Sequence, residues 1–544
     1  MTQISSLLAA SAKSKMILEQ ASVALQAGDK GDAERLLRHH LLVQPNDAAA
    51  LDKLAGLAIG AGNVEEATML LRRAAGSDPT VTRLQSLIFH LQTQVGAQAA
   101  LDEINKLPSV YRTDFIILAC EAACLGRLGN HVRQIEIYKA LERSDPRNAP
   151  LLKSLADAYK TVGRIDDAVA AAKRAIEADP GYGEAWWTLS NFKSYEFNRR
   201  EISTMRKMLR RHRSESDALH LHFALGTAFG QHGDYANSFR HFEAGNAIRR
   251  NGLSIEAMCI TPLIDQAIAA YDAALFERHK LAGHPAKDPI FVVGLHRSGS
   301  TLIEQILASH PLIEGTAELT VMQQIWERLA RFAELHGRNP FEELRDLDSE
   351  TLTAIGEEYV ERTRDFRVTD RPYFVDKLPA NWLQIGLIRL ALPNATIIEA
   401  RRNPMACGFS NFCQNYASGV RFSYSLESIG IFYRDYLRFC EHIDAIQPGA
   451  VHRVVNEQLI ADPEAETRAM LKAIGVPFDP ACLEFHKNGR AVATPSAEQV
   501  RRPINREGVD HWRHYESWLG PLRDALGRAI ETWDWPFCAT QVRH

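Results

Sequence analysis

The sequence predicts two architectures in one chain, a solenoid of paired α-helices followed by an α/β domain with a mainly parallel sheet. Proline and glycine recur 34 residues apart in the first half, as in Pro45 and Pro79 or Gly28 and Gly62. A continuous apolar run at 290–293 then changes the pattern from helical to strand-like. A glycine-bounded loop and an apolar helix follow this run at once, an order typical of phosphate-binding α/β domains.

The composition fits a chain of several globular domains. At roughly 100–200 residues per domain, the 544 residues predict about three domains, or one domain plus a repeat array. Hydrophobic residues make up 46% and charged residues 24%, values that exclude collagen-like and disordered classes. The 63 basic and 67 acidic residues give a net charge of −4, so no overall positive charge favours nucleic acid.

The cysteines and the apolar runs bear on the compartment. Eight cysteines without a CxxC pair supply neither a zinc ligand set nor a disulfide framework. No stretch approaches the ~18 apolar residues of a membrane span. The opening residues 1–20 lack a signal-peptide core and predict an amphipathic helix. We therefore expect a cytoplasmic protein with reduced thiols and no membrane span.

The repeated unit of the first half carries small and apolar residues at fixed offsets. One unit reads Leu51, Leu54, Ala58, Gly62, Ala67, Leu71, Ala74, Pro79, and a later one reads Leu152, Leu155, Tyr159, Gly163, Ala168, Ala172, Ala175, Pro180. Small residues let two antiparallel helices approach closely, the glycine makes the turn between them, and the proline ends the second helix. This pattern resembles the tetratricopeptide repeat.

Three units match that repeat well, and they end at Pro45, Pro79 and Pro180. The unit at 115–148 has Gln134 where a small residue is expected, and two degraded units follow before residue 250. We expect a repeat domain over 1–253, a helical connector over 254–288 and the second domain over 289–544. Repeat arrays commonly present a concave surface to a protein or peptide, so we expect such a partner.

The second domain opens with a phosphate-binding pattern. After the apolar run comes the loop Gly294-Leu295-His296-Arg297-Ser298-Gly299-Ser300-Thr301, and then an apolar helix. A strand, a glycine-bounded loop and a helix N-terminus together present backbone N–H groups to a phosphate. Gly294 and Gly299 have the GxxxxG spacing of a Walker A loop, but Ser300 stands where a nucleotide triphosphatase carries its lysine. Arg297 is the cation within the loop.

A second basic turn follows another predicted strand, at 396–400. The strand ends in Arg401-Arg402-Asn403-Pro404, and Ser410 lies in the helix that comes next. Arg402 and Ser410 can converge on one phosphate, the arginine through bidentate charge-assisted hydrogen bonds. The two turns therefore predict two phosphate sites on the same sheet.

These elements resemble the paired phosphate-binding elements of sulfotransferases that use 3′-phosphoadenosine 5′-phosphosulfate (PAPS). The similarity is to the tyrosylprotein-sulfotransferase-like group, which includes bacterial proteins that fuse tetratricopeptide repeats to this domain. It spans about residues 289–537 and rests on the loop, DKLP at Asp376–Pro379, RNPMACGFS at Arg402–Ser410 and SAEQVRRPIN at Ser496–Asn505. The resemblance implies a P-loop-like α/β fold, PAPS as the sulfuryl donor, a hydroxyl-bearing acceptor and no metal.

The resemblance also implies roles in binding the donor. The loop would hold the 5′-phosphosulfate through His296, Arg297, Ser298, Gly299, Ser300 and Thr301. Arg402 and Ser410 would hold the 3′-phosphate.

Catalytic roles follow from the same resemblance. Glu318 would accept the proton of the acceptor, with Glu314 and His310 close by as alternatives. Lys377, after the predicted strand at 373–375, would stabilise the bridging or leaving oxygen, with Arg297 on the sulfonate side. Ser496 matches a serine of the family near that oxygen.

Two positions depart from the pattern of the family. Asn456 stands where related sequences usually have tyrosine near the nucleotide, and His511 replaces a lysine that helps to hold the 3′-phosphate. Arg501, Arg502 and Arg513 are the nearby candidates for the missing charge. These departures allow weaker nucleotide binding or a different choice of acceptor.

Two other functions stay open at this point. A P-loop kinase would bind ATP with Mg²⁺, and Ser300 in the lysine position argues against it. A catalytically inactive repeat scaffold with a nucleotide-binding domain would bind partners without turnover. Glu318 and Lys377 argue against the scaffold, whereas Asn456 and His511 favour it. A protein tyrosine, a glycan and a small molecule all remain possible acceptors.

Overall fold

The computed structural model describes residues 16–211, 214–316, 318–417, 420–492, 494, 496–531 and 533. The predicted opening helix therefore lies largely outside the described residues, although residues 16–26 are helical. Packing divides the chain into two compact units, Met1–Ala158 and Tyr159–His544. This division follows contacts rather than sequence pattern, and the predicted boundaries at 253 and 288 stay predictions.

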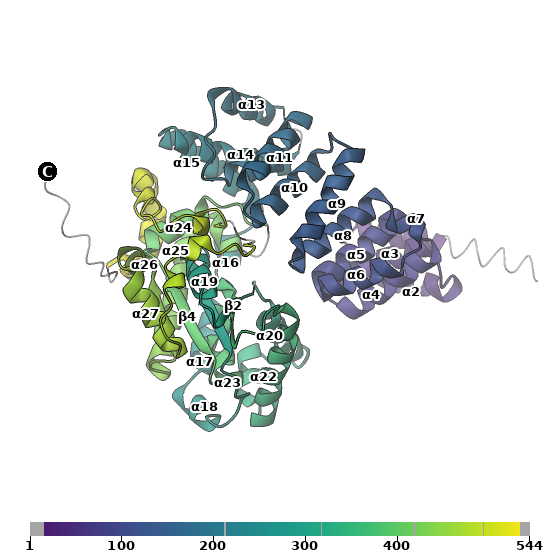
Figure 1. Cartoon of the computed structure of the whole chain (residues 1–544). Coiled ribbons are helices and arrows are strands. Elements are labelled where there is room, and N and C mark those ends of the chain that lie inside the picture. The colour runs from purple at the N-terminus through teal and green to yellow at the C-terminus, as the bar shows by residue number, and fades with distance from the viewer. Residues whose placement is uncertain are drawn as a thin grey trace, which may run out of the picture. The chain divides into compact units, whose positions relative to one another are not determined.

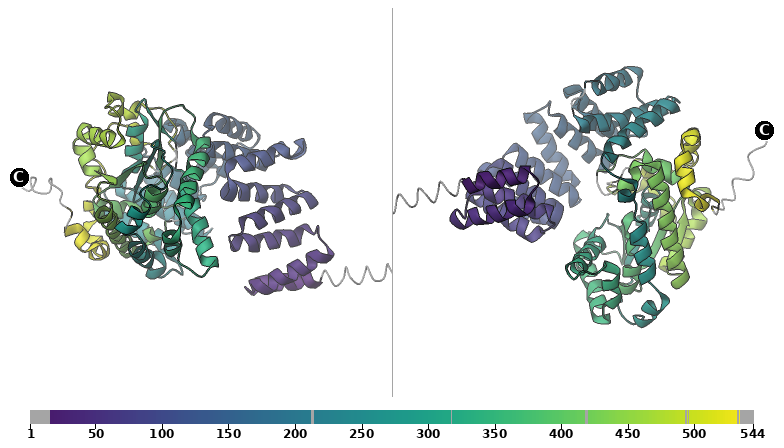
Figure 2. Two further views of the ribbon diagram at one scale, coloured as in Figure 1. Left: turned by 90° about the horizontal axis from the view of Figure 1, so that it is seen from below. Right: turned by 180° about the vertical axis from the view of Figure 1, so that it is seen from behind.

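The first unit consists of paired helices that stack one after another (Figures 1 and 2). The helices are α2 (Lys30–Val43), α3 (Ala48–Gly60), α4 (Val64–Ser77), α5 (Val81–His90), α6 (Ala97–Lys106), α7 (Ser109–Arg112), α8 (Phe115–Arg127) and α9 (His131–Ser144), with a π-helical turn, η1 (Leu91–Val95), after α5. Helix α10 (Ala149–Thr161) crosses the unit boundary. The predicted solenoid of paired helices is confirmed.

The turn glycines explain why the chain reverses at the predicted spacing. Gly28, Gly62 and Gly129 have φ angles of +81°, +72° and +79°, which glycine adopts without steric cost. The large side chain of Gln134 in α9 packs against Gly126. A β-carbon at residue 126 would lie only 2.3 Å from the Gln134 amide nitrogen. The missing side chain at residue 126 thus makes room for the large residue at 134.

The second unit begins with more helices of the same kind. They are α11 (Ile165–Ala178), α12 (Gly183–Ser190), α13 (Arg199–Leu209), α14 (Glu215–Gln231) and α15 (Tyr235–Arg250), followed by the short α16 (Ile255–Met258), α17 (Thr261–Ala270) and α18 (Ala273–Arg278). Helices α14 and α15 pack as an antiparallel pair joined at Gly233, where φ is +73°. The two degraded repeats and the helical connector of the sequence are therefore helical.

A parallel sheet forms the centre of the α/β part. The described residues contain five strands in the order β2-β3-β1-β4-β5, and every neighbouring pair is parallel. The strands are β1 (Pro289–Gly294), β2 (Ile313–Gly315), β3 (Tyr373–Lys377), β4 (Thr396–Arg401) and β5 (Val451–Val455). The mainly parallel sheet predicted from the sequence is confirmed.

Helices surround this sheet and complete the domain (Figure 1). They are α19 (Ser300–Ala308), α20 (Val321–Leu335), α21 (Pro340–Asp346), α22 (Ser349–Thr363), α23 (Ile385–Ala391), α24 (Pro404–Phe412), α25 (Leu426–Ile446), α26 (Asn456–Ala461), α27 (Pro463–Ile474), α28 (Gly520–Leu526) and α29 (Arg528–Glu531). Short 3-10 segments connect them: η2 (Arg364–Phe366), η3 (Pro379–Gln384), η4 (Arg421–Tyr424), η5 (Pro480–Cys482), η6 (Phe485–Lys487), η7 (Gln499–Arg501) and η8 (His511–Trp518).

Strand β1 is apolar throughout because both of its faces are covered. Ile290 and Val292 pack into a cluster that includes Ile303 of α19, whereas Phe291 and Val293 belong to a second and larger cluster. Side chains alternate between the two faces of a strand, so an unbroken apolar run indicates helices on both sides.

The preceding helices share this larger cluster. Phe223, Phe239 and Phe242 of α14 and α15 lie in the same apolar core as Phe291 of β1. The Ser238 and Tyr515 hydroxyl oxygens lie 2.9 Å apart in a buried hydrogen bond that adds to this contact. Helices α14 and α15 are therefore packed onto the α/β part as one body.

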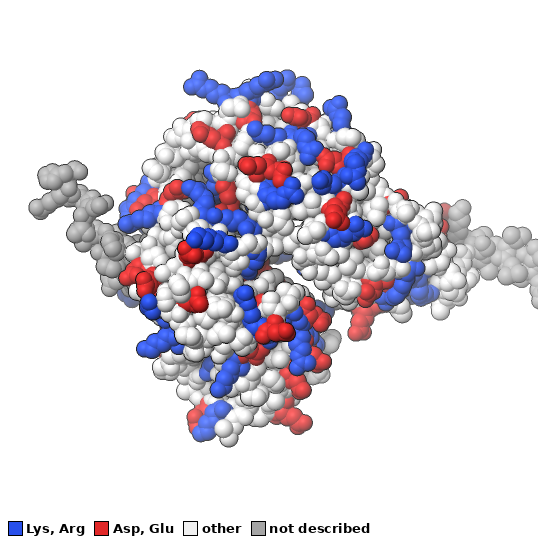
Figure 3. Space-filling view, viewed as in Figure 1, with Lys and Arg blue, Asp and Glu red and all other residues white. Residues whose placement is uncertain are grey.

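Charged side chains of both signs are interspersed over the face shown in Figure 3, with basic side chains gathered over α13. Among the described residues, no helix combines the length and the apolar composition that a membrane crossing requires.

Candidate functional site

The loop between β1 and α19 has the backbone geometry of an anion-binding turn. Gly294 and Gly299 have φ angles of +136° and +102°, and Arg297, at +68°, is the one non-glycine described residue with positive φ. Helix α19 starts after Gly299 without a side-chain cap. The first N–H groups of a helix have no partner within it, so the N-terminus of α19 offers N–H donors and a partial positive charge.

Close packing requires the two glycines. A β-carbon at Gly294 would lie 2.4 Å from the Ala400 carbonyl oxygen of β4, and one at Gly299 would lie 2.5 Å from the Asn456 side-chain oxygen. The Ser298 hydroxyl donates to the Leu295 carbonyl oxygen at 2.7 Å and so closes the turn from inside.

Arg297 joins the two predicted phosphate elements. Its Nε donates to the Ser410 hydroxyl and its Nη1 to the Ser496 hydroxyl, each at 3.0 Å. Its carbonyl oxygen accepts a hydrogen bond of 3.0 Å from Arg402 Nη1. The structure therefore brings together four residues that the sequence assigns to donor binding and catalysis, although 199 positions separate Arg297 from Ser496.

Arg402 is half-buried and makes no ion pair with the described residues. Its Nη2 donates to the Gly508 carbonyl oxygen at 2.5 Å, and its Nε is buried without a hydrogen-bond partner. Burial lowers the pKa of this guanidinium. Neither Arg402 nor Arg297 pairs with a carboxylate among the described residues. Buried charge of one sign is costly unless it is compensated, so this arrangement suits an anion.

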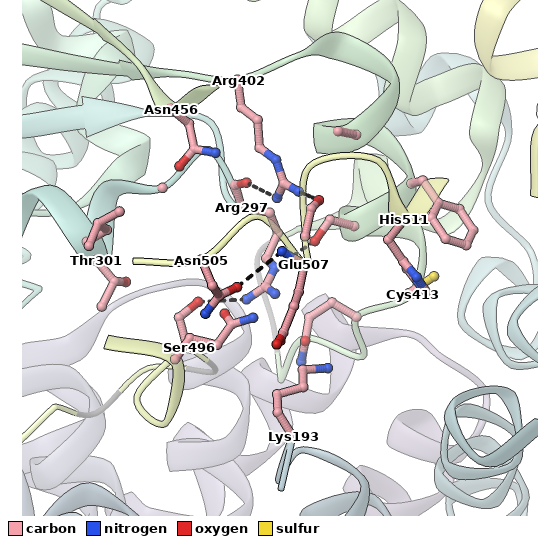
Figure 4. Close-up of a pocket in the computed structure, with 18 of the residues that line it drawn as sticks. Lys193, Arg297, Thr301, Arg402, Cys413, Asn456, Ser496, Asn505, Glu507 and His511 are labelled. Carbon is pink, nitrogen blue, oxygen red and sulfur yellow. Dashed lines mark hydrogen bonds between the residues drawn. The ribbon is translucent and has the colours of Figure 1, made fainter. Parts of the chain in front are cut away.

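A cavity of about 480 Å³ opens in front of these groups (Figure 4). The predicted residues that line it are Arg297, Gly299, Ser300, Thr301, Arg402, Ser410 and Ser496. Such a volume is typical of sites for small ligands. Thr301 and Thr494 place their hydroxyl oxygens 3.4 Å apart near the N-terminus of α19.

His296 and Ser298 do not line the cavity. The His296 ring lies beside the rings of Tyr416 and Phe422, and burial lowers the pKa of His296 to about 4, so that it is neutral near pH 7. The His296 carbonyl oxygen accepts a hydrogen bond of 2.8 Å from the Asn411 amide. Both residues thus have internal roles that fix the loop.

Lys377 and Glu318, the predicted catalytic pair, are in contact with each other. The Lys377 ammonium at the end of β3 binds the Glu318 carboxylate and lies 3.7 Å from Glu304 of α19. Lys377 is buried, whereas 47% of the Glu318 side chain is exposed. Neither of the two lines the cavity. Their charges act on the pKa of His296 in opposite directions, Glu318 raising it and Lys377 lowering it.

The two alternatives to Glu318 have structural roles. Glu314 Oε1 accepts the backbone N–H groups of Val368 and Thr369 at 2.7 and 3.0 Å. The His310 ring bonds to the Pro477 carbonyl oxygen and to the Leu312 N–H at 2.9 and 3.2 Å. Both side chains are buried, so the geometry favours Glu318 as the accessible carboxylate.

The two positions that depart from the family pattern both line the cavity. Asn456 lies against Gly299. Burial, with a contribution from the charges of Lys193 and Arg402, lowers the pKa of His511 to about 4. Because His511 is therefore neutral near pH 7, it does not supply the positive charge of a lysine.

The three arginines considered as replacements differ in position. Arg502 lines the cavity and lies 3.5 Å from Glu507. Arg501 Nη2 instead donates to the carbonyl oxygens of Thr161 and Arg490, each at 3.1 Å. Arg513 pairs with Asp510 at 2.9 Å.

Sequence reasoning missed one wall of the cavity. Residues of the helical segment before β1 line it, among them Trp187, Asn191, Lys193, Gln231 and Phe242. The sequence signal that could have indicated this wall is the loss of the repeat pattern around residues 186–242. Residues there line the cavity and so have requirements other than repeat stacking.

No cluster of histidine, cysteine, aspartate and glutamate suited to a metal ion occurs in the part of the chain that the structure describes.

The fold and the site define a parallel α/β domain whose β1–α19 loop, at the carboxyl end of β1, has the backbone geometry of an anion-binding turn. Residues 289–480 match the model of the sulfotransferase family. The match lies within the α/β part of the chain, which follows the helical repeats.

Comparison with known proteins gives one curated relative and several solved structures. A protein of Aquifex aeolicus (strain VF5), described as uncharacterized, is 32% identical over 310 residues, which cover 56% of this chain and 41% of that protein. The match thus spans less than half of the length of the relative.

Among solved structures, the sulfotransferase domain of the Synechococcus PCC 7002 olefin synthase is 23% identical, with a TM-score of 0.32 and coverage of 42% of this chain and 89% of that one. The sulfotransferase domain from the curacin biosynthetic pathway is 17% identical, with a TM-score of 0.30 and coverage of 43% and 92%. MamA is 20% identical, with a TM-score of 0.28 and coverage of 31% and 94%.

Proposed function

We propose that this protein is a PAPS-dependent sulfotransferase that moves a sulfuryl group to a hydroxyl acceptor. The observation that carries the proposal is the pair of guanidinium groups without counter-ions, Arg297 and Arg402, which line a cavity beside the free N-terminus of α19. A donor with phosphate groups at both ends offers the negative charge that these groups lack. The Ser410 and Ser496 hydroxyls, already bonded to Arg297, add donors on either side.

In this proposal the loop after β1 and the turn after β4 bind different phosphate groups of the donor. The backbone N–H groups at Gly299–Thr301 bind the 5′-phosphosulfate, and Arg402 with Ser410 binds the 3′-phosphate. The buried Nε of Arg402, which has no partner, is the donor that a phosphate oxygen would satisfy.

Glu318 and Lys377 carry the chemistry in this proposal. In sulfuryl transfer the acceptor oxygen bonds to sulfur, and the bond from sulfur to the phosphate oxygen breaks with its electron pair left on the phosphate. Glu318 accepts the hydroxyl proton, while Lys377 and Arg297 stabilise the charge that develops on the leaving and sulfonate oxygens. Because Lys377 contacts Glu318, the proton acceptor and the stabilising cation are held side by side.

The repeats are part of the proposal as the binding region for a protein partner or for the acceptor. Stacked helical pairs commonly offer an extended concave surface for a peptide. A cytoplasmic location, predicted from the cysteine content, belongs to the same proposal.

Calorimetric titration with adenosine 3′,5′-bisphosphate, the desulfated product, tests the proposal. We expect micromolar binding of the bisphosphate, no binding of ATP with Mg²⁺, and loss of bisphosphate binding in Arg402→Ala. Arg421→Ala, which removes an exposed arginine of the same domain, is the matched control. Glu318→Gln should bind the bisphosphate as well as the wild type does. If the folded protein did not bind the bisphosphate, or bound ATP more tightly than the bisphosphate, the result would contradict the proposal.

A further inference from the structure

The helical segment before the sheet contributes a lysine to the cavity of the α/β part. Lys193 lies in the loop between α12 and α13 and lines the cavity together with Arg297 and Arg402. Figure 4 shows Lys193 at the lower edge of the pocket, Arg402 at the upper edge and Arg297 between them. Residues far apart in the sequence thus place three cations around one space.

Hydrogen bonds hold this loop in place. The Glu498 carboxylate accepts the backbone N–H groups of Lys193 and Ser194 at 2.6 and 2.8 Å. Glu498 is buried and lies two residues after Ser496, whose hydroxyl accepts from Arg297. The position of Lys193 is therefore fixed to the segment that carries a predicted site residue.

The Lys193 ammonium makes no ion pair and no hydrogen bond with the described residues, although the cavity leaves it accessible to water. Burial by the cavity walls and the nearby Arg297 guanidinium lower the pKa of Lys193. Arg502, by contrast, already has Glu507 as a partner at 3.5 Å. Of the two cations, Lys193 is the one whose charge an incoming anion would compensate.

The position of His511 relates the Lys193 ammonium to the proposed 3′-phosphate site. His511 lines the same cavity as Lys193 and Arg402, and Figure 4 shows it at the right of the pocket, between the heights of Arg402 above and Lys193 below. The His511 ring also lies 6.2 Å from the ring of Phe409, the residue before Ser410. A neutral histidine there leaves a phosphate short of one positive charge, which Lys193 can supply from the opposite wall.

We propose that Lys193 binds the 3′-phosphate of the donor together with Arg402 and Ser410, so that the helical segment completes the nucleotide site and replaces the cation that His511 does not provide. This inference rests on the proposed function, because it assumes a 3′-phosphorylated nucleotide in the cavity. It gives the helices α12 and α13 a direct part in recognising the donor.

Titration of the full chain with adenosine 3′,5′-bisphosphate and with adenosine 5′-phosphate, which lacks the 3′-phosphate, tests this assignment. Removal of one charged hydrogen bond in Lys193→Gln should weaken bisphosphate binding by about 10- to 100-fold. Binding of adenosine 5′-phosphate should stay unchanged. Lys193→Arg should keep most of the affinity, and Lys207→Gln, which removes an exposed lysine of α13, should have no effect.

A rescue experiment separates loss of charge from loss of structure. The double variant Lys193→Gln/His511→Lys returns a cation to the same part of the cavity and should recover bisphosphate affinity. Equal affinity of the wild type and Lys193→Gln for the bisphosphate overturns the inference while the proposed function stands. If the wild type bound the bisphosphate no better than adenosine 5′-phosphate, the result would contradict both the 3′-phosphate site and the proposed function.

Discussion

Asp376 is a buried carboxyl group directly before the proposed catalytic lysine, Lys377. It accepts a hydrogen bond of 2.8 Å from the Tyr359 hydroxyl, and its second oxygen, Oδ1, is buried without a partner. Burial raises the pKa of Asp376 to about 7, from an ordinary value of 3.8. The protonated carboxyl is therefore the favoured form in the folded protein at mildly acidic pH. Because Asp376 is buried in β3, ionisation of this carboxyl destabilises the folded protein.

The raised pKa of Asp376 predicts how stability depends on pH. Below about pH 4 the carboxyl is protonated in both the folded and the unfolded chain, so its contribution to stability is fully present. As the pH rises from about 4 through 7, the unfolded chain loses the proton while the folded chain still holds it, so that contribution is progressively lost. Asp376→Asn cannot ionise and should therefore gain stability relative to the wild type, by a few kcal/mol between about pH 4 and about pH 8.

Urea unfolding of both proteins across this pH range measures the difference in the free energy of unfolding. Asp370→Asn, which removes an exposed carboxylate from the loop before β3, controls for the loss of one negative charge. Parallel pH profiles for Asp376→Asn and the wild type would show that burial of Asp376 does not have the predicted effect.

At the scale of elements, the loop between β1 and α19 depends on Gly299. Its φ angle of +102° is strained for any other residue, and a β-carbon there would lie 2.5 Å from the Asn456 side-chain oxygen. Gly299→Ala should therefore shift the N-terminus of α19, lower stability by about 1–3 kcal/mol and weaken binding of the bisphosphate at least 10-fold. Thermal unfolding and titration measure the two effects.

Gly489→Ala is the matched control for this loop, because nothing lies within 4 Å of the added β-carbon and the backbone there is not left-handed. If Gly299→Ala bound the bisphosphate as the wild type does, the N–H groups at the start of α19 would not be the binding groups.

The elements themselves could be predicted because they depend on local pattern. The apolar run at 290–293 is buried on both faces and forms β1, and the glycines at the predicted turns adopt positive φ. The helical pair formed by α5 and α6 was not predicted as a repeat unit. Gly96 keeps the 34-residue spacing from Gly62, but Leu101 stands where the small residue is expected and Thr113 where the closing proline would fall.

The candidate site could be predicted only in part. Arg297, Arg402 and Ser410 lie in short motifs, and the structure brings them together. Lys193 belongs to a loop between helices, and nothing in its local sequence indicates that the loop reaches Glu498, 305 positions away. Contacts of this kind depend on how whole segments pack, so they cannot be predicted from periodicity and motif spacing.

At the scale of the whole molecule, the site belongs to one compact unit that is larger than the predicted second domain. All residues that line the cavity lie between Trp187 and Tyr515, within the unit Tyr159–His544. Asn246 of α15 donates to the Phe412 carbonyl oxygen at 2.8 Å, and Arg249 donates to Asn415 at 2.8 and 3.0 Å. These bonds and the shared apolar core make α14 and α15 part of the structure that holds the site.

This organisation predicts different outcomes for two truncated chains. A chain of residues 149–544 keeps α10 whole, together with every cavity residue, and should bind adenosine 3′,5′-bisphosphate with nearly the affinity of the full protein. A chain of residues 289–544, cut at the predicted domain boundary, loses Lys193 and exposes the core surface that α14 and α15 cover. Since burial contributes roughly 25 cal/mol per Å² of apolar surface, we expect this shorter chain to be strongly destabilised and to bind the bisphosphate weakly or not at all. Circular dichroism during thermal unfolding and the same titration distinguish the two chains. Full affinity in residues 289–544 would show that the helical wall contributes nothing to the site, whereas loss of binding in residues 149–544 would show that the first unit is required.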